Sequence, residues 1–398
     1  MATSGKPLSV AVIGAGMAGR THAAGYRNVN TVFAAGLPPV RLAAIADANV
    51  ALGEDAARRY GYEKALPNWE AVAEDPTIDA VSIVVGNDLH RPIVEALVAA
   101  GKHVLCEKPL AGSLEDARAM AELERTADVV TAVGYTFRRS PAISAVRDHV
   151  QRGELGDLTL FSGRYWCDYA TDPNGPLSWR FKGGPGSGAL GDIGVHAIDT
   201  AEYLAGPIAA VSGASLSTQI PRRPLPLGAV VGHNAAPVSD EFGEVENEDT
   251  ASFTARFESG LVGTFSLSRT AFGLPNGLGF DIVGLGGRAA FDQHRPAEYL
   301  FDDAQPDART RGARHIIAGP QMPYFKGGYP MEAPGVGGGN AEMFTYQARA
   351  FLDQVAGVAD PLPACATFAD GLRTMEIIRA VVESSHNGGA AVTVPAAS

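Results

Sequence analysis

The stretch LSVAVIGAGMAG, residues 8–19, decides the fold. Its first half is apolar except for one serine, which is typical of a buried strand, and a helical pattern begins at Met17. Between them lies a G-x-G-x-x-G motif. Gly14 permits a tight turn, Gly16 lets the backbone approach a phosphate, and Gly19 lets helix and strand pack closely. The order strand, turn, helix favours a dinucleotide-binding βαβ unit over an ordinary glycine-rich turn.

The next strand pattern, VRLAAIAD, ends at Asp47, 28 residues after Gly19. The usual spacing is about 20 residues, and the insertion NTVFAAGLPPV accounts for the excess. A carboxylate at this position accepts hydrogen bonds from ribose hydroxyls and repels a 2′-phosphate. The expected cofactor is therefore NAD rather than NADP, with Met17 and Ala18 at the helix N-terminus beside its phosphates.

Short apolar runs alternate with helical patterns as far as residue 135. Such alternation predicts a doubly wound parallel sheet, an α/β Rossmann domain over residues 1–137. From residue 138 to 398 the patterns predict an α+β domain with a large, open, mainly antiparallel sheet, and the helices near 340–386 could pack back toward the first domain. Residues 222–248 and 302–340 read as loops, and the acidic run EFGEVENED (241–249) as a solvated one.

Composition excludes several classes of protein. The chain has 398 residues and a net charge of −12, which argues against nucleic-acid binding. No apolar run is long enough to span a membrane. The three cysteines have no C-x-x-C spacing, the nine histidines show no ligand spacing, and so no metal site is expected. The N-terminus lacks the features of a signal peptide, which favours a cytoplasmic location.

A second motif, GDIGVHAIDT, places Asp192 and His196 four residues apart, on one face of a predicted helix, with Asp199 within reach. Histidine titrates near neutral pH and suits a general base. A histidine on an apolar helix face is nevertheless more often a core residue, so the spacing alone leaves both interpretations open. The glycine-rich lead GGPGSGALG favours the functional one.

The stretch HVLCEKP ends a predicted strand on Glu107, Lys108 and Pro109. In a doubly wound sheet, ligands bind beyond the carboxyl ends of the strands. Glu107 and Lys108 are therefore expected at the cofactor crevice, with Lys108 as a donor to a substrate oxygen. Proline restricts Lys108 to extended geometry.

These motifs together resemble the Gfo/Idh/MocA oxidoreductases, the family of glucose–fructose oxidoreductase and inositol dehydrogenase. The resemblance covers nearly the whole chain and rests on GAGMAG, on EKP and on GDIGVH. It implies that Lys108, Asp192 and His196 form the catalytic group. It also implies cofactor contacts from Trp179 and Arg180. The family's Thr-Pro-Asn is replaced here by Val85-Gly86-Asn87, but Asn87 and His90 are kept, which implies an intact nicotinamide side.

The segments DPNGPLSWRF, GSGALGDI and GGGNAEMF resemble the subgroup of levoglucosan dehydrogenases. The implied reaction is NAD-dependent oxidation of a ring hydroxyl, at C3, of an anhydrosugar or glycoside. The alternatives are an inositol or aldose dehydrogenase, an NAD-dependent glycoside hydrolase, or a non-catalytic sugar sensor on the same fold. A sensor is expected to lose Lys108 or His196, and both are present.

Sugar recognition requires aromatic faces and orienting polar groups. Besides Lys108, Asp192 and His196, the candidates at or after the ends of predicted strands are Tyr135, Arg139, Tyr165 and Asp168. For each of them, core packing or a surface ion pair is as good an interpretation. An open sheet face is expected to be a large apolar patch, which predicts a homodimer or homotetramer through that sheet.

Overall fold

The structure is a computed structural model, and it describes residues 6–32, 36–228, 230, 236–303, 309, 312–322, 324, 333–335 and 339–396. The chain forms two compact units. One comprises Met1–Ser144 and Ala318–Leu372, and the other comprises Ala145–Ile317 and Arg373–Ser398. The domain limits expected from the sequence, at 137 and 138, stay a prediction.

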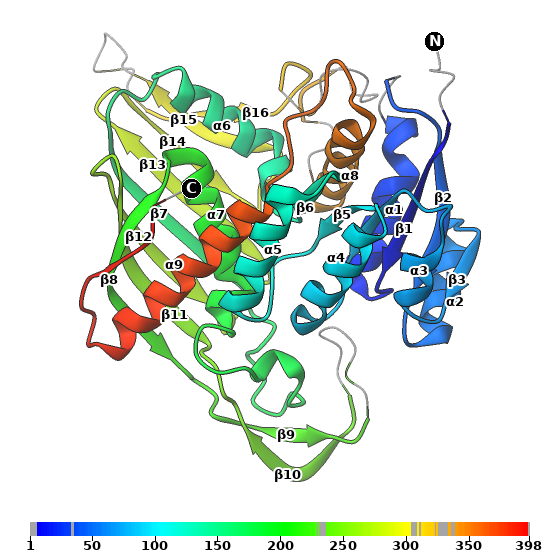
Figure 1. The fold of residues 1–398 in the computed structure, drawn as a ribbon. Coiled ribbons are helices and arrows are strands. Elements are labelled where there is room, and N and C mark those ends of the chain that lie inside the picture. Colours follow the sequence, from blue (N-terminus) through cyan, green and yellow to red (C-terminus); the bar gives the residue numbers. More distant parts are fainter. Residues whose placement is uncertain are drawn as a thin grey trace. The chain divides into compact units, whose positions relative to one another are not determined.

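The first unit contains a six-stranded parallel sheet in the order β3-β2-β1-β4-β5-β6, the Rossmann order (Figure 1). Its elements are β1 (Leu8–Ile13), α1 (Met17–Val32), β2 (Val40–Ala46), α2 (Val50–Tyr60), β3 (Lys64–Leu66), α3 (Glu70–Glu74), β4 (Ala80–Ile83), α4 (His90–Ala99), β5 (His103–Cys106), α5 (Leu114–Thr126) and β6 (Thr131–Val133). The order reverses between β1 and β4, where such folds bind ligands.

The strands β1, β4 and β5 are buried almost throughout, as expected of a parallel sheet covered on both faces. Helix α8 (Asn340–Ala356) also belongs to this unit and packs on α1. Gly25 permits the close approach, since a Cβ there would lie 2.8 Å from the carbonyl oxygen of Phe344. A helix from the far end of the sequence therefore helps to fix the helix that opens at the glycine turn.

The second unit is built on a nine-stranded mixed sheet in the order β16-β15-β14-β13-β7-β12-β11-β8-β17. Only the pair β7–β12 is parallel, so the prediction of a mainly antiparallel open sheet is confirmed. The strands are β7 (Leu158–Trp166), β8 (Ile208–Ser217), β11 (Thr250–Phe257), β12 (Val262–Ser268), β13 (Gly277–Gly284), β14 (Gly287–Asp292), β15 (Glu298–Asp303), β16 (Arg314–Ile317) and β17 (Val392–Thr393).

One face of this sheet packs against helices. Helix α7 (Val195–Ala205) contacts β7 and β13, and stacked phenylalanines fill the core beneath it. Helices α6 (Pro141–Gln151) and α9 (Phe368–His386) have their bounds close to those that the sequence predicts. Buried residues alternate with more exposed ones along β11 and β12, so one face of the sheet is covered and the other is more open.

The stretch 222–248, expected to be a loop, instead contains two paired antiparallel strands, β9 (Arg222–Pro226) and β10 (Val238–Glu244). Its strands contain prolines and lack apolar alternation, which is why the pattern did not predict it. The end of the acidic run is also not solvated, because Asn247, Glu248 and Asp249 are buried. In the stretch 302–340 the structure has β16, and many of the remaining residues lie outside the described part.

Candidate active site

The glycine turn follows β1 and opens α1. Gly14 has φ +104°, and a Cβ on it would lie 2.0 Å from the carbonyl oxygen of Val84. A Cβ on Gly19 would lie 1.9 Å from the carbonyl oxygen of Gly14, so this position also requires glycine. Gly16 differs, since a Cβ there would meet nothing within 4 Å. Two glycines are thus required by the fold, while the third leaves open space beside its backbone.

Asp47 follows β2 and supports this turn. One carboxylate oxygen accepts a hydrogen bond from the backbone amide of Ala15 at 2.7 Å, and the other accepts one from Asn49 at 2.7 Å. Met17 and Ala18 form the first turn of α1, and the Met17 side chain is 68% exposed. The helix N-terminus, the open Gly16 and a half-buried carboxylate form a cradle that fits an adenosine diphosphate moiety.

Asn87 and His90 follow β4, the neighbour of β1. Asn87 is partly exposed, whereas the His90 ring is fully buried. The His90 ring nitrogens lie 3.1 Å from the carbonyl oxygen of Leu110 and 3.3 Å from that of Val85. Burial lowers the pKa of His90 more than these carbonyls raise it. His90 therefore joins two turns of the unit, and its assignment to cofactor binding stays a prediction.

Glu107, at the end of β5, is buried and holds two neighbours. One carboxylate oxygen lies 3.0 Å from Nε2 of His22 on α1, and the other accepts the backbone amide of Lys108 at 3.0 Å. Burial raises the pKa of Glu107, but the hydrogen bond from His22, the charge of Lys108 and the hydrogen bond from the Lys108 amide outweigh it, so the net pKa is lowered. A Cβ on Gly134 would lie 2.5 Å from this carboxylate.

The network continues from His22 into the sheet. Nδ1 of His22 lies 3.1 Å from the hydroxyl of Ser82, which lies 2.8 Å from the hydroxyl of Tyr26. A His22 tautomer with its hydrogen on Nε2 satisfies each group. Tyr26 then donates to Ser82, Ser82 donates to Nδ1, and Nε2 donates to Glu107. The network thus joins α1 and β4 to Glu107, which accepts the backbone amide of Lys108.

Lys108 itself is half-buried and precedes a cis peptide bond to Pro109. Tyr135 and Arg139 lie after β6 and are both buried. The guanidinium of Arg139 donates to the carbonyl oxygens of Pro363 at 2.5 Å and Ala364 at 2.7 Å. Arg139 therefore ties segments of the first unit together, and its expected role in substrate binding stays a prediction.

In the second unit, Asp192 lies in a π-helical turn, Leu190–Gly194, directly before α7. The regular α-helix assumed for Asp192 and His196 is thus interrupted between them, a feature often found at functional sites. Oδ2 of Asp192 accepts a hydrogen bond from the hydroxyl of Tyr169 at 2.9 Å and lies 3.5 Å from the guanidinium of Arg180. Burial and the charge of Asp192 raise the pKa of Tyr169.

His196, in the first turn of α7, is 8% exposed, and its ring centroid lies 6.0 Å from that of Tyr165. The Tyr165 hydroxyl donates to the side chain of Asn276 at 2.7 Å, and burial raises the pKa of Tyr165. Asp168 is partly exposed on the turn after β7, and Asp199 is buried on α7. In this unit Tyr169 and Arg180 both contact Asp192 directly, and His196 lies beside Tyr165.

Trp179 and Arg180 form a short 3₁₀ turn. Trp179 is 57% exposed, and the Arg180 guanidinium lies over its ring, 4.5 Å from the centroid. An exposed aromatic side chain held by a cation presents a flat apolar surface, which suits a ring-shaped ligand. Among the described residues no cluster of potential metal ligands occurs, and no helix there is long and apolar enough to cross a membrane.

Sequence reasoning missed several residues that support these side chains. His22 gave no signal beyond its apolar helix, and Glu248 lay in a run that favoured a solvated loop. Their partners are distant in sequence, Glu107 for His22 and the amides of Gly186 and Leu190 for Glu248. No spacing rule links them.

Comparison with known families agrees with the two-part fold. Residues 8–135 match the model of the oxidoreductase family with an NAD-binding Rossmann fold, and residues 143–290 match the Gfo/Idh/MocA C-terminal domain. The chain therefore belongs to the Gfo/Idh/MocA oxidoreductase family and has its NAD-binding domain. The residues present fit that cofactor, since the cradle at Gly16 and Asp47 lies in the matched segment.

Among curated proteins, levoglucosan dehydrogenase from Pseudarthrobacter phenanthrenivorans is 38% identical over 386 residues, 95% of this chain and 96% of the relative. Myo-inositol 2-dehydrogenase from Thermotoga maritima is 27% identical over 78% of this chain and 81% of its own. A solved structure of levoglucosan dehydrogenase in complex with NADH and levoglucosan matches with a TM-score of 0.87 and 35% identity, over 98% of this chain and all of the other.

Proposed function

We propose that the protein is an NAD-dependent sugar dehydrogenase that oxidises C3 of levoglucosan or a closely related anhydrosugar. The observation that carries the proposal is the full-length similarity to levoglucosan dehydrogenase, which includes the segments around Trp179, Asp192 and His196. The exposed Trp179 and the polar group of Tyr169, Arg180 and Asp192 support a ring-shaped polyol as substrate.

In the proposed site, Gly14–Gly19 and Asp47 hold the adenosine diphosphate part of the cofactor. Asn87, Lys108, Trp179 and Arg180 serve its nicotinamide side, and the buried His90 and Glu107 support that side through the turns they hold. Bound NAD⁺ supplies the hydride acceptor for the reaction. The carboxylate of Asp47 selects NAD, because a 2′-phosphate would be repelled.

Lys108 donates a hydrogen bond to the reacting hydroxyl oxygen and stabilises the negative charge that develops there. His196 takes the hydroxyl proton. Asp192 orients His196 or binds a neighbouring hydroxyl, and Tyr169 and Arg180 fix its carboxylate. Whether His196 or Lys108 is the first base is decided by comparing the pH profiles of kcat in variants of each.

The test is NADH formation by purified protein with NAD⁺ and levoglucosan, glucose, myo-inositol or aryl glucosides. We expect turnover of levoglucosan, and a loss of roughly 10²–10⁴-fold in Lys108→Ala and His196→Ala. Lys6→Ala, at an exposed lysine, is the control. Product analysis by NMR identifies the oxidised carbon.

The alternatives give different results in the same assay. Turnover of inositol or glucose alone would contradict the substrate proposed here. Cleavage of aryl glucosides without net NADH would identify a glycoside hydrolase. NAD⁺ binding without turnover of any sugar would indicate a sensor.

We also propose a cytoplasmic homodimer or homotetramer. The three cysteines are buried free thiols, which suits a reducing compartment. The sheet face away from α7 is less apolar than expected, because central outward positions are serine or threonine, as at Ser252, Thr264 and Ser266. Apolar exceptions on this face include Leu160 and Trp166 on β7 and the two register partners of Leu160, Val262 and Val283. Light scattering after size exclusion measures the mass, and a monomer would contradict this assembly.

A further inference from the structure

Three consecutive polar residues, Asn247, Glu248 and Asp249, are buried just before β11. Their exposed fractions are 2%, 3% and 0%. Burying an acidic pair without partners is strongly unfavourable, so each side chain needs specific hydrogen bonds. The partners include residues of the segment 180–190, which leads into the turn that carries Asp192, and Arg269 after β12.

Glu248 holds the start of the π-helical turn. Its two carboxylate oxygens accept the backbone amides of Gly186 at 2.8 Å and Leu190 at 2.9 Å, and its own carbonyl accepts the amide of Ala189 at 2.9 Å. A Cβ on Gly188 would lie 2.1 Å from that carbonyl, so the two backbones are in direct contact. One residue thus fixes three amides within six residues of Asp192.

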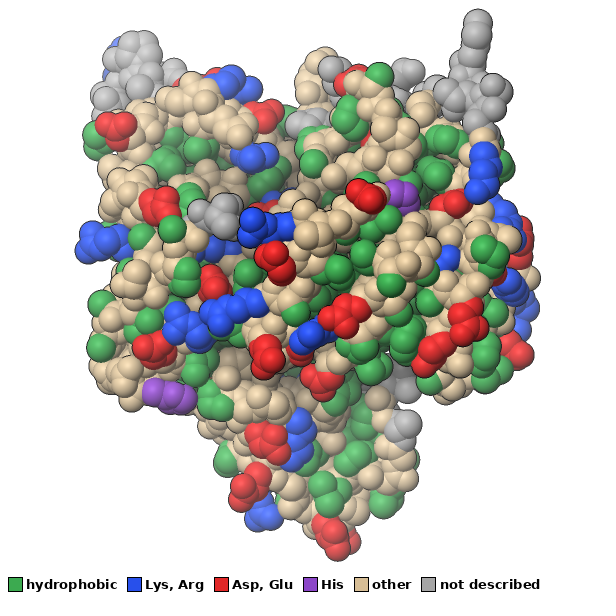
Figure 2. Space-filling view, in the orientation of Figure 1, with side chains coloured by type: hydrophobic (Ala, Val, Ile, Leu, Met, Phe, Trp, Pro, Cys, Tyr) green, Lys and Arg blue, Asp and Glu red, His purple; other side chains and the backbone are tan. Residues whose placement is uncertain are grey.

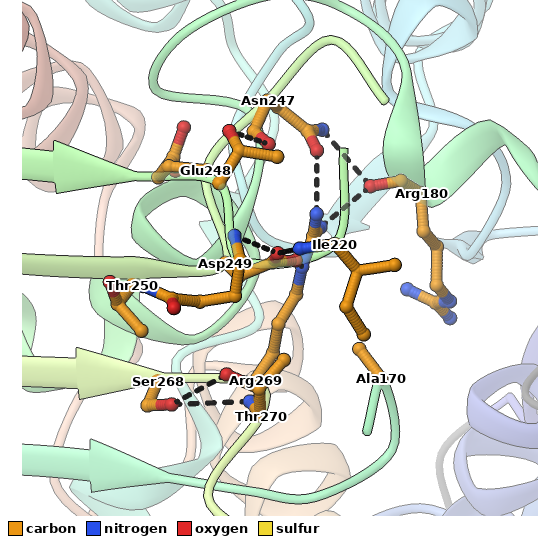
Figure 3. Close-up of polar contacts among 12 residues, drawn as sticks. Ala170, Arg180, Ile220, Asn247, Glu248, Asp249, Thr250, Ser268, Arg269 and Thr270 are labelled. Carbon is orange, nitrogen blue, oxygen red and sulfur yellow. Dashed lines mark hydrogen bonds and ion pairs between the residues drawn. The ribbon is translucent and has the colours of Figure 1, made fainter. Parts of the chain in front are cut away.

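Asn247 holds the other side of the same segment, as Figure 3 shows. Its amide nitrogen donates to the carbonyl oxygens of Arg180 at 3.0 Å and Lys182 at 2.9 Å. Its amide oxygen accepts from Arg269 at 2.8 Å. Arg269 donates a second bond to the Arg180 carbonyl at 2.9 Å.

Arg269 is in turn fixed by Asp249. The two form an ion pair at 2.8 Å, with side chains only 1% and 0% exposed (Figure 3). Asp249 also accepts the amides of Gln219 at 2.6 Å and Ile220 at 2.9 Å, so its charge is well satisfied. This pair anchors the group to the large sheet and leaves Asn247 and Glu248 as its contacts with the segment 180–190.

We propose that Asn247 and Glu248 are positioning residues that set the side chains of Arg180 and Asp192 relative to each other. This inference rests on the proposed function. Glu248 fixes the backbone before Asp192, and Asn247 fixes the carbonyl of Arg180. The side chains of Arg180 and Asp192 then form an ion pair at 3.5 Å. Asn247 and Glu248 thus hold the two ends of the segment 180–190, and both are anchored through Asp249 and Arg269. A substrate site requires side chains that are positioned with this precision.

Two of the three variants that test this are nearly isosteric with the natural residues. Glu248→Gln keeps one acceptor but presents an NH₂ group to a backbone amide, and Glu248→Ala removes both acceptors. Asn247→Asp keeps the acceptor for Arg269 but loses the donor to Arg180 and Lys182. Glu241→Gln, at an exposed carboxylate of β10, is the control.

Two readouts separate positioning from mere stability. In NADH formation with levoglucosan, we expect kcat to fall about 10–100-fold in Glu248→Gln and Asn247→Asp, and further in Glu248→Ala. We expect the KM for NAD⁺ to change much less than kcat, since the glycine turn that holds the adenosine diphosphate part of the cofactor is untouched. Hydrogen exchange measured by mass spectrometry without substrate should be faster in the peptide around 184–192 and unchanged in Glu241→Gln.

A normal kcat together with faster exchange would overturn the proposal and leave the group a structural one. Unchanged exchange would overturn it as well, because the contacts would then not fix this segment. If the unmodified protein turns over no sugar, the proposed function fails, whereas the exchange experiment still decides whether Asn247 and Glu248 hold the backbone. If Glu248→Gln does not fold, Asn247→Asp carries the test.

Discussion

Glu107 shows how a charged residue at a strand end acts through the backbone. Its carboxylate is buried beside Gly134 and divides its two oxygens between the His22 ring and the amide of Lys108. The hydrogen bond from its amide to Glu107 therefore fixes the backbone of Lys108, and with it the start of the Lys108 side chain. The EKP motif can be understood in this way: the glutamate supports the lysine, and His22 supports the glutamate.

We expect Glu107→Gln to lower kcat about tenfold and the free energy of unfolding by about 1–3 kcal/mol, while NAD⁺ affinity stays nearly unchanged. An amide offers one acceptor oxygen, so either His22 or the Lys108 amide loses its partner. The measurements are steady-state kinetics, NAD⁺ titration and urea unfolding.

The control for this prediction is Glu124→Gln. Glu124 also accepts backbone amides, those of Phe368 and Ala369, but it lies on α5 and accepts no hydrogen bond from the Lys108 amide. It should lose stability without losing kcat. Weaker NAD⁺ binding with an unchanged kcat in Glu107→Gln would instead return Glu107 to the role of a cofactor ligand.

At the scale of elements, the turn between β1 and α1 separates a folding requirement from a binding requirement. A Cβ on Gly14 or Gly19 would overlap a backbone carbonyl oxygen, at 2.0 and 1.9 Å, whereas a Cβ on Gly16 would meet no atom within 4 Å. Both kinds of glycine occur in one motif of six residues, and the sequence motif itself does not distinguish them.

We expect Gly14→Ala to destabilise the fold by several kcal/mol, because φ is +104° and the new Cβ would overlap the Val84 carbonyl. Gly16→Ala should fold like the unmodified protein but bind NAD⁺ at least tenfold more weakly. Thermal unfolding and calorimetric titration measure the two effects. Unchanged affinity in Gly16→Ala would mean that the phosphates do not approach this backbone.

Elements with a clear period could be predicted from the sequence, and those set by distant partners could not. The strands β1, β4 and β5 and the helices α6 and α7 follow from apolar periodicity. The π-helical turn at Leu190–Gly194 does not, because it depends on the Glu248 carboxylate, which holds the amides before it. The residues of the candidate site followed from motifs, whereas the residues that hold them followed only from the structure.

For the whole molecule, charge is distributed rather than concentrated. On the face in Figure 2, acidic and basic side chains are intermixed, and neither sign forms a large patch. Many carboxylates pair with arginines at the surface, such as Asp55 with Arg20 and Glu63 with Arg41. Each pair is individually weak. The arginine partners lower the pKa values of both Asp55 and Glu63, so these two pairs act in the same direction with pH.

Acid should therefore destabilise the protein gradually, and Glu154 gives a clear case. Hydrogen bonds from Arg152 and His149 lower the pKa of Glu154 from 4.5 to about 2. A carboxylate with a lowered folded-state pKa stabilises the fold above its unfolded pKa, and this contribution is lost as the pH falls through the folded value. We expect Glu154→Gln to lower the melting temperature slightly at pH 7. The melting curves of the two proteins should converge between pH 4.5 and 2, and salt at about 1 M should narrow the difference at pH 7. A constant offset at every pH would show that the pair contributes nothing through its charge.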